Sequence, residues 1–458
     1  MALLIKNGTI INANNSEKAD VLIEDGKIVK IGNSLQGGIR IDKVIDAKGC
    51  YIFPGGIDPH VHMHLPSPAG YSSDDFLTGS KAALHGGTTT IIDFVTPTKG
   101  QLLSNAIKLR KEEAQNCLTN YSFHVSPIEW RDSIEEEILD CINKEGFKSF
   151  KVYMAYKNSI GLNDDVLLKV MKTVGKAGGM VTAHCELGDD IEELRNEFAK
   201  ENKLSVKYHP LSRPAELEAL AVKKAIELAD EAKCPLYIVH VSTKESLKYI
   251  RDAQKNGQKV IAETCPQYLL LNDSKYQGSF EETAAFIMSP PLRKKEDNEA
   301  LWKAINNGTV TTLGTDHCPF TLKQKESGIH DFRKIPNGAG GVEHRLALLY
   351  TYGVLTEKIS LNQFVALTST NAAKIFGMYP TKGIITEGSD ADIVVWNPEK
   401  ENTISVKTHH QNCDLNIYKG LKIKGSPKYL ILNGKIVLAE NILQQNIQNR
   451  HLLKTNPL

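Results

Sequence analysis

The chain has 458 residues, of which 41% are hydrophobic, and this length exceeds one ordinary domain of ~100–200 residues but suits a large barrel with an appended domain. The 55 basic and 54 acidic residues nearly cancel and form no basic block, which argues against nucleic-acid binding. No run approaches the ~18 consecutive apolar residues of a membrane span, so we expect no membrane segment.

The eight cysteines are scattered along the chain and form no paired framework. The first residues contain only a short apolar run before Lys6, which is too short for the hydrophobic region of a secretory signal. We therefore expect reduced thiols and a cytoplasmic location.

Both ends of the chain carry short β-rich runs joined by tight-turn dipeptides. At the start these dipeptides are Asn7-Gly8 and Asp25-Gly26, and near the end Asn433-Gly434 separates two apolar runs. Both central residues of a type I′ turn need positive φ, which Asn, Asp and Gly tolerate best, so each dipeptide predicts a β-hairpin.

Neither end holds enough strands to form a core by itself. We therefore predict that residues 1–52 and 385–440 combine into one small β-sandwich domain. Residues 441–458 are polar and rich in Gln and Asn, and we expect them to form a C-terminal tail or a subunit contact.

Between residues 53 and 384, short apolar strands alternate with helical segments such as 216–232. The predicted strands are 51–53 with its continuation toward residue 62, 89–94, 122–125, 150–153, 180–184, 236–240, 260–263 and 310–313. Eight strands that alternate with helices favour a parallel (β/α)8 barrel over residues 53–384, with a doubly wound open sheet as the alternative.

The first candidate site lies at the end of the first barrel strand, in Asp58-Pro59-His60-Val61-His62. Residues two apart on a strand point to the same face, so His60 and His62 project together. At the C-terminal mouth of a barrel, two such imidazoles can bind one metal ion.

Further polar residues belong to later apolar strands. Lys151 lies inside its strand, and three residues stand at strand ends, namely His184, His240 and Asp316. A buried strand rarely carries a lysine unless the amine is paired or chemically altered. A packed core does not need titratable groups on five strands that converge on one mouth, whereas a metal centre does.

This order of residues on successive strands resembles the amidohydrolase superfamily with a two-metal centre. More narrowly, six segments resemble the dihydropyrimidinase/D-hydantoinase family: PGGIDPHVHMHLP (54–66), GGTTTIIDF (86–94), FKVYMAY (150–156), MSPPLR (288–293), GTDHCPF (314–320) and PNG (336–338). The similarity runs from about residue 3 to residue 398, which is nearly the whole chain.

The resemblance implies that Lys151 is carboxylated by CO₂ to a carbamate, which turns a buried ammonium into an anion that bridges two cations. One divalent metal would then bind His60, His62, the carbamate and Asp316, and the other would bind the carbamate, His184 and His240. Nitrogen and oxygen donors without thiolate suit Zn²⁺, although other divalent metals also accept them.

The resemblance also implies a reaction, the metal-dependent hydrolysis of a cyclic amide. A hydroxide shared by the two cations attacks the ring carbonyl, and Asp316 passes its proton to the departing ring nitrogen. Tyr156 supports the oxyanion, and the backbone at Ser289 and Asn337 binds the remaining amide groups of the ring. The small-molecule substrate would be a 5,6-dihydropyrimidine of pyrimidine degradation or a 5-substituted hydantoin, the product an N-carbamoyl amino acid, and the assembly a homotetramer or homodimer.

Two alternatives belong to other groups of the same superfamily. A dihydroorotase or allantoinase shares the scaffold, but dihydroorotases commonly carry an arginine two residues past the His-x-His pair, where this chain has His64. A non-catalytic scaffold of the collapsin-response-mediator kind has lost metal ligands, whereas this chain keeps all six candidates. The metal content of the purified protein would separate this scaffold from the enzymes.

Overall fold

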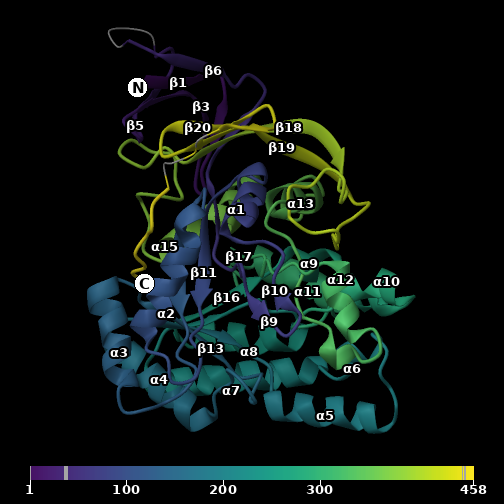
Figure 1. The fold of residues 1–458 in the computed structure, drawn as a ribbon. Coiled ribbons are helices and arrows are strands. Elements are labelled where there is room, and N and C mark those ends of the chain that lie inside the picture. The colour runs from purple at the N-terminus through teal and green to yellow at the C-terminus, as the bar shows by residue number, and fades with distance from the viewer. Residues whose placement is uncertain (1, 36–39, 446, 448–449, 458) are drawn as a thin grey trace.

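The computed structural model describes residues 2–35, 40–445, 447 and 450–457. Figure 1 shows two parts: a β-rich part that combines the purple N-terminal and yellow C-terminal segments, and an α/β part that contains the middle of the chain. Within the described residues, no helix is both long enough and apolar enough to cross a membrane.

The middle of the chain forms an eight-stranded parallel barrel. Its strands follow one another in sequence order: β8 (Gly56–Asp58), β11 (Thr88–Val95), β12 (Asn120–Val125), β13 (Ser149–Tyr153), β14 (Met180–His184), β15 (Leu236–Ile238), β16 (Val260–Thr264) and β17 (Thr312–Leu313). Each strand pairs in parallel with the next. The predicted (β/α)8 fold is confirmed, and the open-sheet alternative is wrong.

The first and last barrel strands, β8 and β17, share no ladder in the described structure and are joined by side chains. The Arg345 guanidinium donates to the carbonyl oxygens of Ile57 (2.9 Å) and Leu313 (2.8 Å). Asp58 accepts hydrogen bonds from the backbone N–H (3.1 Å) and the hydroxyl (2.6 Å) of Thr315. The segments that follow these two strands therefore lie side by side at the mouth of the barrel.

Helices connect the strands and surround the barrel (Figure 1). The α-helices are α1 (Phe76–His85), α2 (Leu103–Glu113), α3 (Ile134–Asp140), α4 (Asp164–Lys176), α5 (Gly188–Lys200), α6 (Tyr208–Leu211), α7 (Ala215–Ala232), α8 (Lys244–Lys255), α9 (Pro266–Leu270), α10 (Phe280–Thr283), α11 (Lys295–Asn306), α12 (Leu322–Lys325), α13 (Arg345–Leu349), α14 (Leu361–Val365) and α15 (Asn371–Ile375). Helix α7 confirms the helix predicted over 216–232 and buries Ala221, Val222 and Ala225 against the barrel.

Short 3₁₀ and π segments extend or link these helices. They are η1 (Ala114–Asn116), η2 (Cys141–Glu145), η3 (Asp273–Tyr276), η4 (Ala284–Phe286), η5 (Glu326–Gly328), η6 (Phe332–Lys334), η7 (Tyr350–Val354) and η8 (Ala366–Thr370). A two-stranded hairpin, β9 (Pro66–Ser67) with β10 (Gly70–Tyr71), follows the His-x-His segment.

The β-rich part consists of two sheets built from both ends of the chain. The four-stranded sheet has the order β5-β4-β1-β6, with β1 (Ala2–Lys6), β4 (Asp20–Glu24), β5 (Lys27–Gly32) and β6 (Lys43–Asp46). The seven-stranded sheet has the order β21-β20-β19-β18-β7-β2-β3, with β2 (Thr9–Ile11), β3 (Ser16–Lys18), β7 (Tyr51–Pro54), β18 (Ile393–Thr403), β19 (Lys422–Leu432), β20 (Lys435–Ala439) and β21 (Ile442–Leu443).

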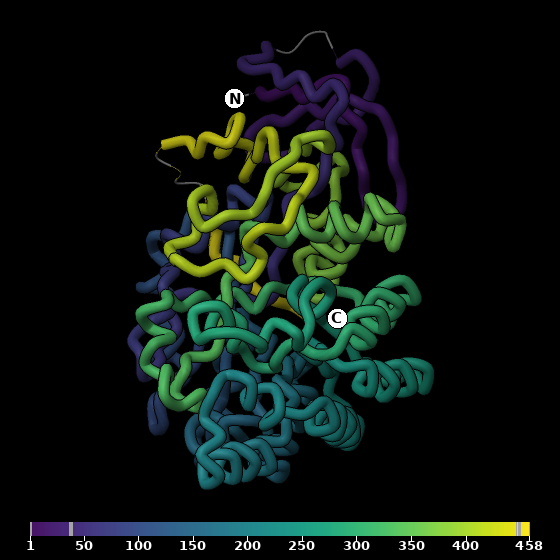
Figure 2. The backbone as a smooth tube through the Cα atoms, turned by 90° about the vertical axis from the view of Figure 1, so that its right-hand side faces the viewer, coloured from purple at the N-terminus to yellow at the C-terminus, as the bar shows by residue number. Residues whose placement is uncertain are grey.

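Apolar residues of the two sheets form a core of their own, separate from that of the barrel. Ile5 and Val21 of the smaller sheet and Ile52 and Val395 of the larger sheet belong to it. Figure 2 shows the purple and yellow segments adjacent to each other on one side of the barrel. The predicted combination of both chain ends into a β-sandwich is thus confirmed as part of the fold.

Two of the three predicted hairpins form. Asp25-Gly26 joins β4 to β5, and Asn433-Gly434 joins β19 to β20, with positive φ at every turn residue. The prediction for Asn7-Gly8 is wrong, because the chain passes there from the smaller sheet to the larger one. Gly8 keeps an ordinary φ, and a Cβ on it would lie 2.5 Å from the side chain of Ile52, so close packing explains this glycine.

The segment 51–53 does not begin the barrel, as we predicted, but lies in β7 of the larger sheet, between β18 and β2. The barrel strand β8 starts anew after Gly55. A Cβ at Gly55 would lie 2.1 Å from the Thr89 hydroxyl, so only glycine fits where the chain passes from one part to the other.

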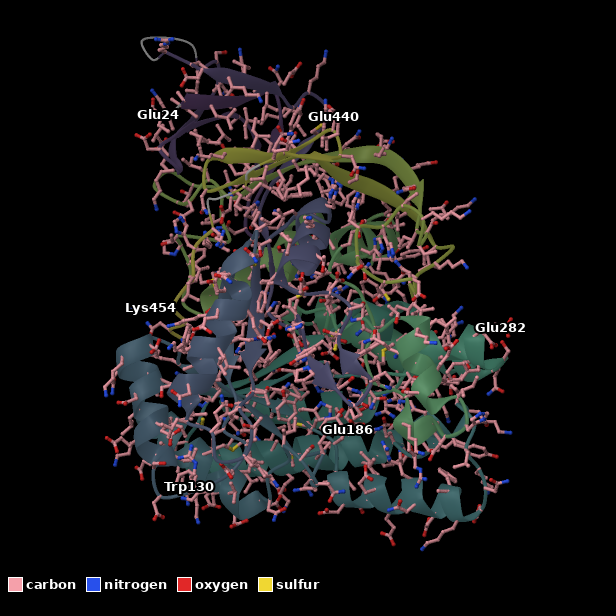
Figure 3. All side chains as sticks on the ribbon, viewed as in Figure 1. Glu24, Trp130, Glu186, Glu282, Glu440 and Lys454 are labelled. Atoms are coloured by element: carbon pink, nitrogen blue, oxygen red, sulfur yellow. The ribbon has the colours of Figure 1, made fainter. Side chains whose placement is uncertain are left out.

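After β21, the described residues 450–457 return along the barrel. Tyr121 N–H of β12 donates to the His451 carbonyl, and Leu453 N–H donates back to the Tyr121 carbonyl. In Figure 3, Lys454 lies beside the barrel, whereas Glu440 lies on the β-rich part. The end of the chain thus joins the two parts of the molecule.

Candidate metal centre and active site

Three of the predicted ligands converge where the barrel closes. The Nε2 atoms of His60 and His62 lie 3.2 Å apart, and each lies 3.1 Å from Oδ1 of Asp316. β8 ends at Asp58, so the two histidines lie just after the strand and not within it. Val61 between them bridges to the segment after β17, which keeps both imidazoles on one side.

A second set of donors stands beside the first. Nδ1 of His184, the last residue of β14, lies 2.9 Å from Nε2 of His240, which follows β15 by two residues. The ring centroids of His60 and His240 are 5.4 Å apart. One ligand atom from each of His60, His240 and Asp316 falls within 4.8 Å of the others.

Lys151 lies on β13 next to both sets, with 1% of its surface exposed. Its Nζ is 4.9 Å from the ring centroid of Phe94, which also contacts the two imidazoles of the first set. Among the described residues, no carboxylate forms an ion pair with this ammonium. Burial lowers the pKa of Lys151 to about 8, against the opposing charges of Asp316 and Glu263.

The separations of the donor atoms fit divalent cations. Ligand atoms bound at ~2.0–2.1 Å to a tetrahedral Zn²⁺ lie about 3.3 Å from one another. The donor pairs here lie 3.2 Å apart in the first set and 2.9 Å apart in the second. Imidazole and carboxylate donors without thiolate also suit such a cation.

The backbone at three candidate residues adopts the left-handed region that favours glycine. The φ angles are 59° at Tyr156, 40° at His240 and 54° at Asp316. Such a conformation costs a non-glycine residue of order 1–3 kcal/mol and is typical of functional sites. Three of the candidate residues therefore lie in a conformation that other turns of the chain also adopt, and here it directs their side chains at the barrel mouth.

A buried carboxylate stands behind one imidazole of each set. Glu263 of β16 lies 2.7 Å from Nδ1 of His60 and also accepts the backbone N–H of His240 at 3.0 Å. Glu186, which lies inside the barrel part in Figure 3, is 2.8 Å from Nε2 of His184. A carboxylate fixes the proton on the nitrogen that it contacts, which leaves Nε2 of His60 and Nδ1 of His184 free to bind a metal.

These contacts set the charges of the site. Burial by itself lowers the pKa of His60, but the carboxylates of Glu263 and Asp316 outweigh it and raise the pKa to about 9. Burial raises the pKa of Asp316, but the charges and hydrogen bonds of His60 and His62 outweigh it, and the pKa falls well below its usual value. Asp316 is therefore ionised near neutral pH, as a metal ligand must be.

The chain beyond His62 is held by a buried ion pair. Asp93, in the segment GGTTTIIDF, accepts the backbone N–H of Met63 at 2.7 Å. The Arg110 guanidinium of α2 donates to the Asp93 carboxylate and to the Met63 carbonyl. The ion pair therefore fixes where the His-x-His segment leaves the mouth.

Tyr156 lies beside the second donor set, with its ring centroid 5.3 Å from that of His184. Burial raises the pKa of its phenol, which stays a hydrogen-bond donor near neutral pH, although the Arg213 charge and the Ser289 hydroxyl oppose this shift. Ser289 lies close enough to Tyr156 to affect this pKa, but its hydroxyl forms no hydrogen bond among the described residues.

Asn337 and Ser289 lie on two different loops. A 2.9 Å hydrogen bond from Gly338 N–H to the Ile287 carbonyl joins the Asn337 loop to the Ser289 loop. Gly338 has φ 144°, and a Cβ there would lie 2.3 Å from the Cys318 carbonyl. Only glycine therefore allows this close approach.

The structure brings the six candidate ligands together at one mouth and places Tyr156 and Ser289 beside them. Sequence reasoning missed the carboxylates Glu263 and Glu186. Glu263 could have been found by the reasoning applied to Lys151, because it is a charged side chain in an apolar strand, 260–263. Glu186 lies two residues after the end of β14, a position like that of Asp316 after β17, so the same signal could have found it.

Comparison with known proteins gives the family. The model of the amidohydrolase family matches residues 51–437. A D-hydantoinase of Geobacillus stearothermophilus is 43% identical over 443 residues, which span 96% of this chain and 93% of the relative. A dihydropyrimidinase of Rattus norvegicus is 41% identical, over 95% of this chain and 85% of the relative.

Solved structures agree with the sequence relatives. The crystal structure of a dihydropyrimidinase from Brevibacillus agri superposes with a TM-score of 0.98 at 41% identity, over 100% of this chain and 99% of that one. The chain belongs to the amidohydrolase family, and within it to the group of dihydropyrimidinases and hydantoinases.

Proposed function

We propose that this protein is a metal-dependent cyclic amidohydrolase. It opens the ring of a 5,6-dihydropyrimidine, such as dihydrouracil or dihydrothymine, or of a 5-substituted hydantoin, and releases an N-carbamoyl amino acid. The names of its relatives, D-hydantoinase and dihydropyrimidinase, support this substrate class. The observation that carries the proposal is the pair of donor sets at the barrel mouth with the buried, unpaired Lys151 beside them.

The metal centre in this proposal holds two divalent cations, of which Zn²⁺ fits the donors best. His60, His62 and Asp316 would hold one cation and His184 and His240 the other, and a carbamate formed from Lys151 and CO₂ would supply a further oxygen donor. Burial without a counter-ion supports the carbamate, because this modification replaces a costly ammonium by an anion between cations. When bound, two such cations polarise a substrate carbonyl and lower the pKa of water from 15.7 toward ~7.

The side chains around the cations have separate roles in the reaction. Asp316 accepts the proton of the attacking water and delivers it to the ring nitrogen, which leaves poorly unless it is protonated. The Tyr156 phenol donates to the oxyanion as it develops on the ring carbonyl. Backbone groups at Ser289 and Asn337 bind the remaining amide groups of the ring.

The proposal also includes the organisation of the protein. The barrel, whose first strand is Gly56–Asp58, is the catalytic domain, and the two sheets built from both ends of the chain, β7 and β21 included, form the second domain. The assembly is a homotetramer or a homodimer in the cytoplasm, and the eight free cysteines support this location.

The test is a comparison of kcat/KM for ring opening. The purified protein is loaded with Zn²⁺ and bicarbonate and offered dihydrouracil, dihydrothymine and several 5-substituted hydantoins, with dihydroorotate and allantoin as controls. We expect at least one of the first two classes to be opened and the activity to be lost on chelation. A preference for a control ring would favour the dihydroorotase or allantoinase alternative, and a protein that binds no metal would favour the scaffold.

A further inference from the structure

A second buried lysine lies outside the metal centre. Lys325 is the last residue of α12, and 1% of its surface is exposed. Its Nζ donates to three backbone carbonyls, those of Ile287 (2.9 Å), Pro336 (2.8 Å) and Gly338 (2.8 Å). A neutral amine has two N–H donors and an ammonium has three, so this arrangement requires the protonated form.

Among the residues that the structure describes, no charged partner explains the burial of this lysine. The titratable groups that face it are the thiols of Cys318 and Cys413, and burial raises the pKa of both, so they are neutral near neutral pH. The Phe320 ring also lies nearby, with its centroid 5.8 Å from Nζ of Lys325. Burial accordingly lowers the pKa of Lys325 to about 7. An unpaired buried ammonium is costly, so its retention calls for a reason.

The three carbonyls belong to the two loops that carry Ser289 and Asn337. Pro336 and Gly338 flank Asn337 directly, and Ile287 precedes Ser289 by two residues. Lys325 is thus a bridge between the loops, and it adds to the direct hydrogen bond from Gly338 N–H to the Ile287 carbonyl.

Other side chains hold the rest of the Ser289 loop. The His209 ring donates to the Met288 carbonyl at 2.8 Å, and the Tyr268 hydroxyl donates to the Pro290 carbonyl at 2.7 Å. Within the described residues, the Ser289 carbonyl and both backbone groups of Asn337 have no hydrogen-bond partner. The neighbouring carbonyls on the two loops thus already accept hydrogen bonds. The Ser289 carbonyl and the backbone groups of Asn337, which we propose to bind the ring, do not have such partners among the described residues.

Helix α12 is itself fixed on both sides. Thr321 and Gln324 form a capping box, and Gln324 also donates to the Tyr71 carbonyl of the β9–β10 hairpin at 2.6 Å. Leu322 N–H donates to Asp414 at 2.9 Å. These contacts hold α12 in place, and with it the position of Lys325.

We propose that Lys325 is a positioning residue for substrate binding, whose ammonium sets the separation between the backbone groups of Ser289 and Asn337 that grip the ring. This inference rests on the proposed function of those two loops. It predicts that loss of the ammonium weakens binding of the ring in the ground state and the transition state alike, which raises KM and leaves kcat nearly unchanged.

The test uses Lys325→Gln and Lys325→Met, with Lys382→Gln as the matched control. Lys382 is also a buried lysine, but it pairs with Asp390 (3.0 Å) and Asp392 (2.6 Å), away from the loops. Gln keeps two N–H donors without the charge, whereas Met keeps none. The measurements are KM and kcat for the best ring substrate, Zn²⁺ content and thermal stability.

We expect KM to rise about tenfold in Lys325→Gln and further in Lys325→Met, with kcat within about threefold and Zn²⁺ content unchanged. Lys382→Gln should lose thermal stability and keep its KM. An unchanged KM in Lys325→Gln, or an equal rise in the control, would overturn the inference. Failure of both Lys325 variants to fold would assign this lysine a structural role only and would overturn it too.

The two proposals fail in different ways. A wild-type protein that opens no ring would overturn the proposed function and this inference with it. A wild-type protein that opens a ring, combined with an unchanged KM in Lys325→Gln, would overturn the inference alone.

Discussion

The carboxylate behind His60 offers a sharp test of the metal centre. Replacement of Glu263 by Gln keeps the size of the side chain and one acceptor oxygen, so His60 Nδ1 (2.7 Å) and His240 N–H (3.0 Å) still find a partner. The new amide group can donate to the Tyr237 hydroxyl, which now lies 2.8 Å from Glu263. The variant loses the negative charge of Glu263, which makes the His60 imidazole less basic.

The expected size of the effect follows from the position of Glu263. Loss of a carboxylate that orients a metal-bound histidine typically weakens metal binding 10–100-fold, or by about 1.4–2.7 kcal/mol. The Glu263 carboxylate contacts the imidazole of one candidate ligand, His60, and the backbone N–H of another, His240. We therefore expect the upper half of this range. Fold and thermal stability should change little, because each hydrogen bond keeps a partner.

The assay is a Zn²⁺ titration of the metal-free protein in competition with a chelator of known affinity. Glu343→Gln serves as the control, because Glu343 also binds an imidazole, Nδ1 of His410 at 2.8 Å, and the backbone N–H of the same residue, at 2.7 Å, but outside the centre. We expect this control to bind Zn²⁺ as the wild type does. Equal affinities in Glu263→Gln and the wild type, or equal losses in both variants, would refute the reasoning.

Three further predictions concern the same site. Tyr156→Phe should lower kcat about 10²–10³-fold at unchanged Zn²⁺ content, because it removes one donor to the oxyanion, and a wild-type kcat would exclude this role. Lys151→Met should reduce the Zn²⁺ content, measured by elemental analysis, because the shared ligand is lost; two tightly bound ions in this variant would contradict the carbamate. In the metal-free protein the pKa of His60 is about 9, so protons compete with Zn²⁺ below that pH and the affinity should fall as the pH falls. Calorimetry at pH 8 in two buffers should then show proton release on Zn²⁺ binding, smaller in Glu263→Gln, and an equal release in both proteins would contradict the assignment.

The sequence predicted the barrel well, because alternation of apolar strands with helices leaves few other architectures. It failed where one segment could serve two sheets. Residues 51–53 are apolar and lie shortly before the His-x-His segment, and their pairing with β18 and β2 in the folded chain shows that a new strand starts after them. The hairpin prediction for Asn7-Gly8 was wrong for a similar reason. The dipeptide predicts a tight turn, but it does not show to which sheet the next strand belongs.

The candidate ligands could be predicted because each is chemically out of place in an apolar strand or at its end. Lys325 could not be predicted, since it lies in the polar stretch 323–326, where its neighbour Lys323 is exposed. Its environment is created by two loops distant in sequence, whose carbonyls meet only in the folded chain. A sequence pattern shows the types of side chains along the chain. It does not show which backbone carbonyls meet in the folded structure.

The pairing of β7 with β18 has a consequence for synthesis of the protein. Ile52 lies opposite Val395, so during translation the whole barrel is made before the first strand of that pair can find its partner. At ~5–20 residues per second, this delay lasts roughly 20–70 s. An open sheet edge invites pairing with other chains. A chaperone that shields the nascent N-terminal strands should therefore raise the yield of native protein more than it does for folds whose sheets close from neighbouring segments.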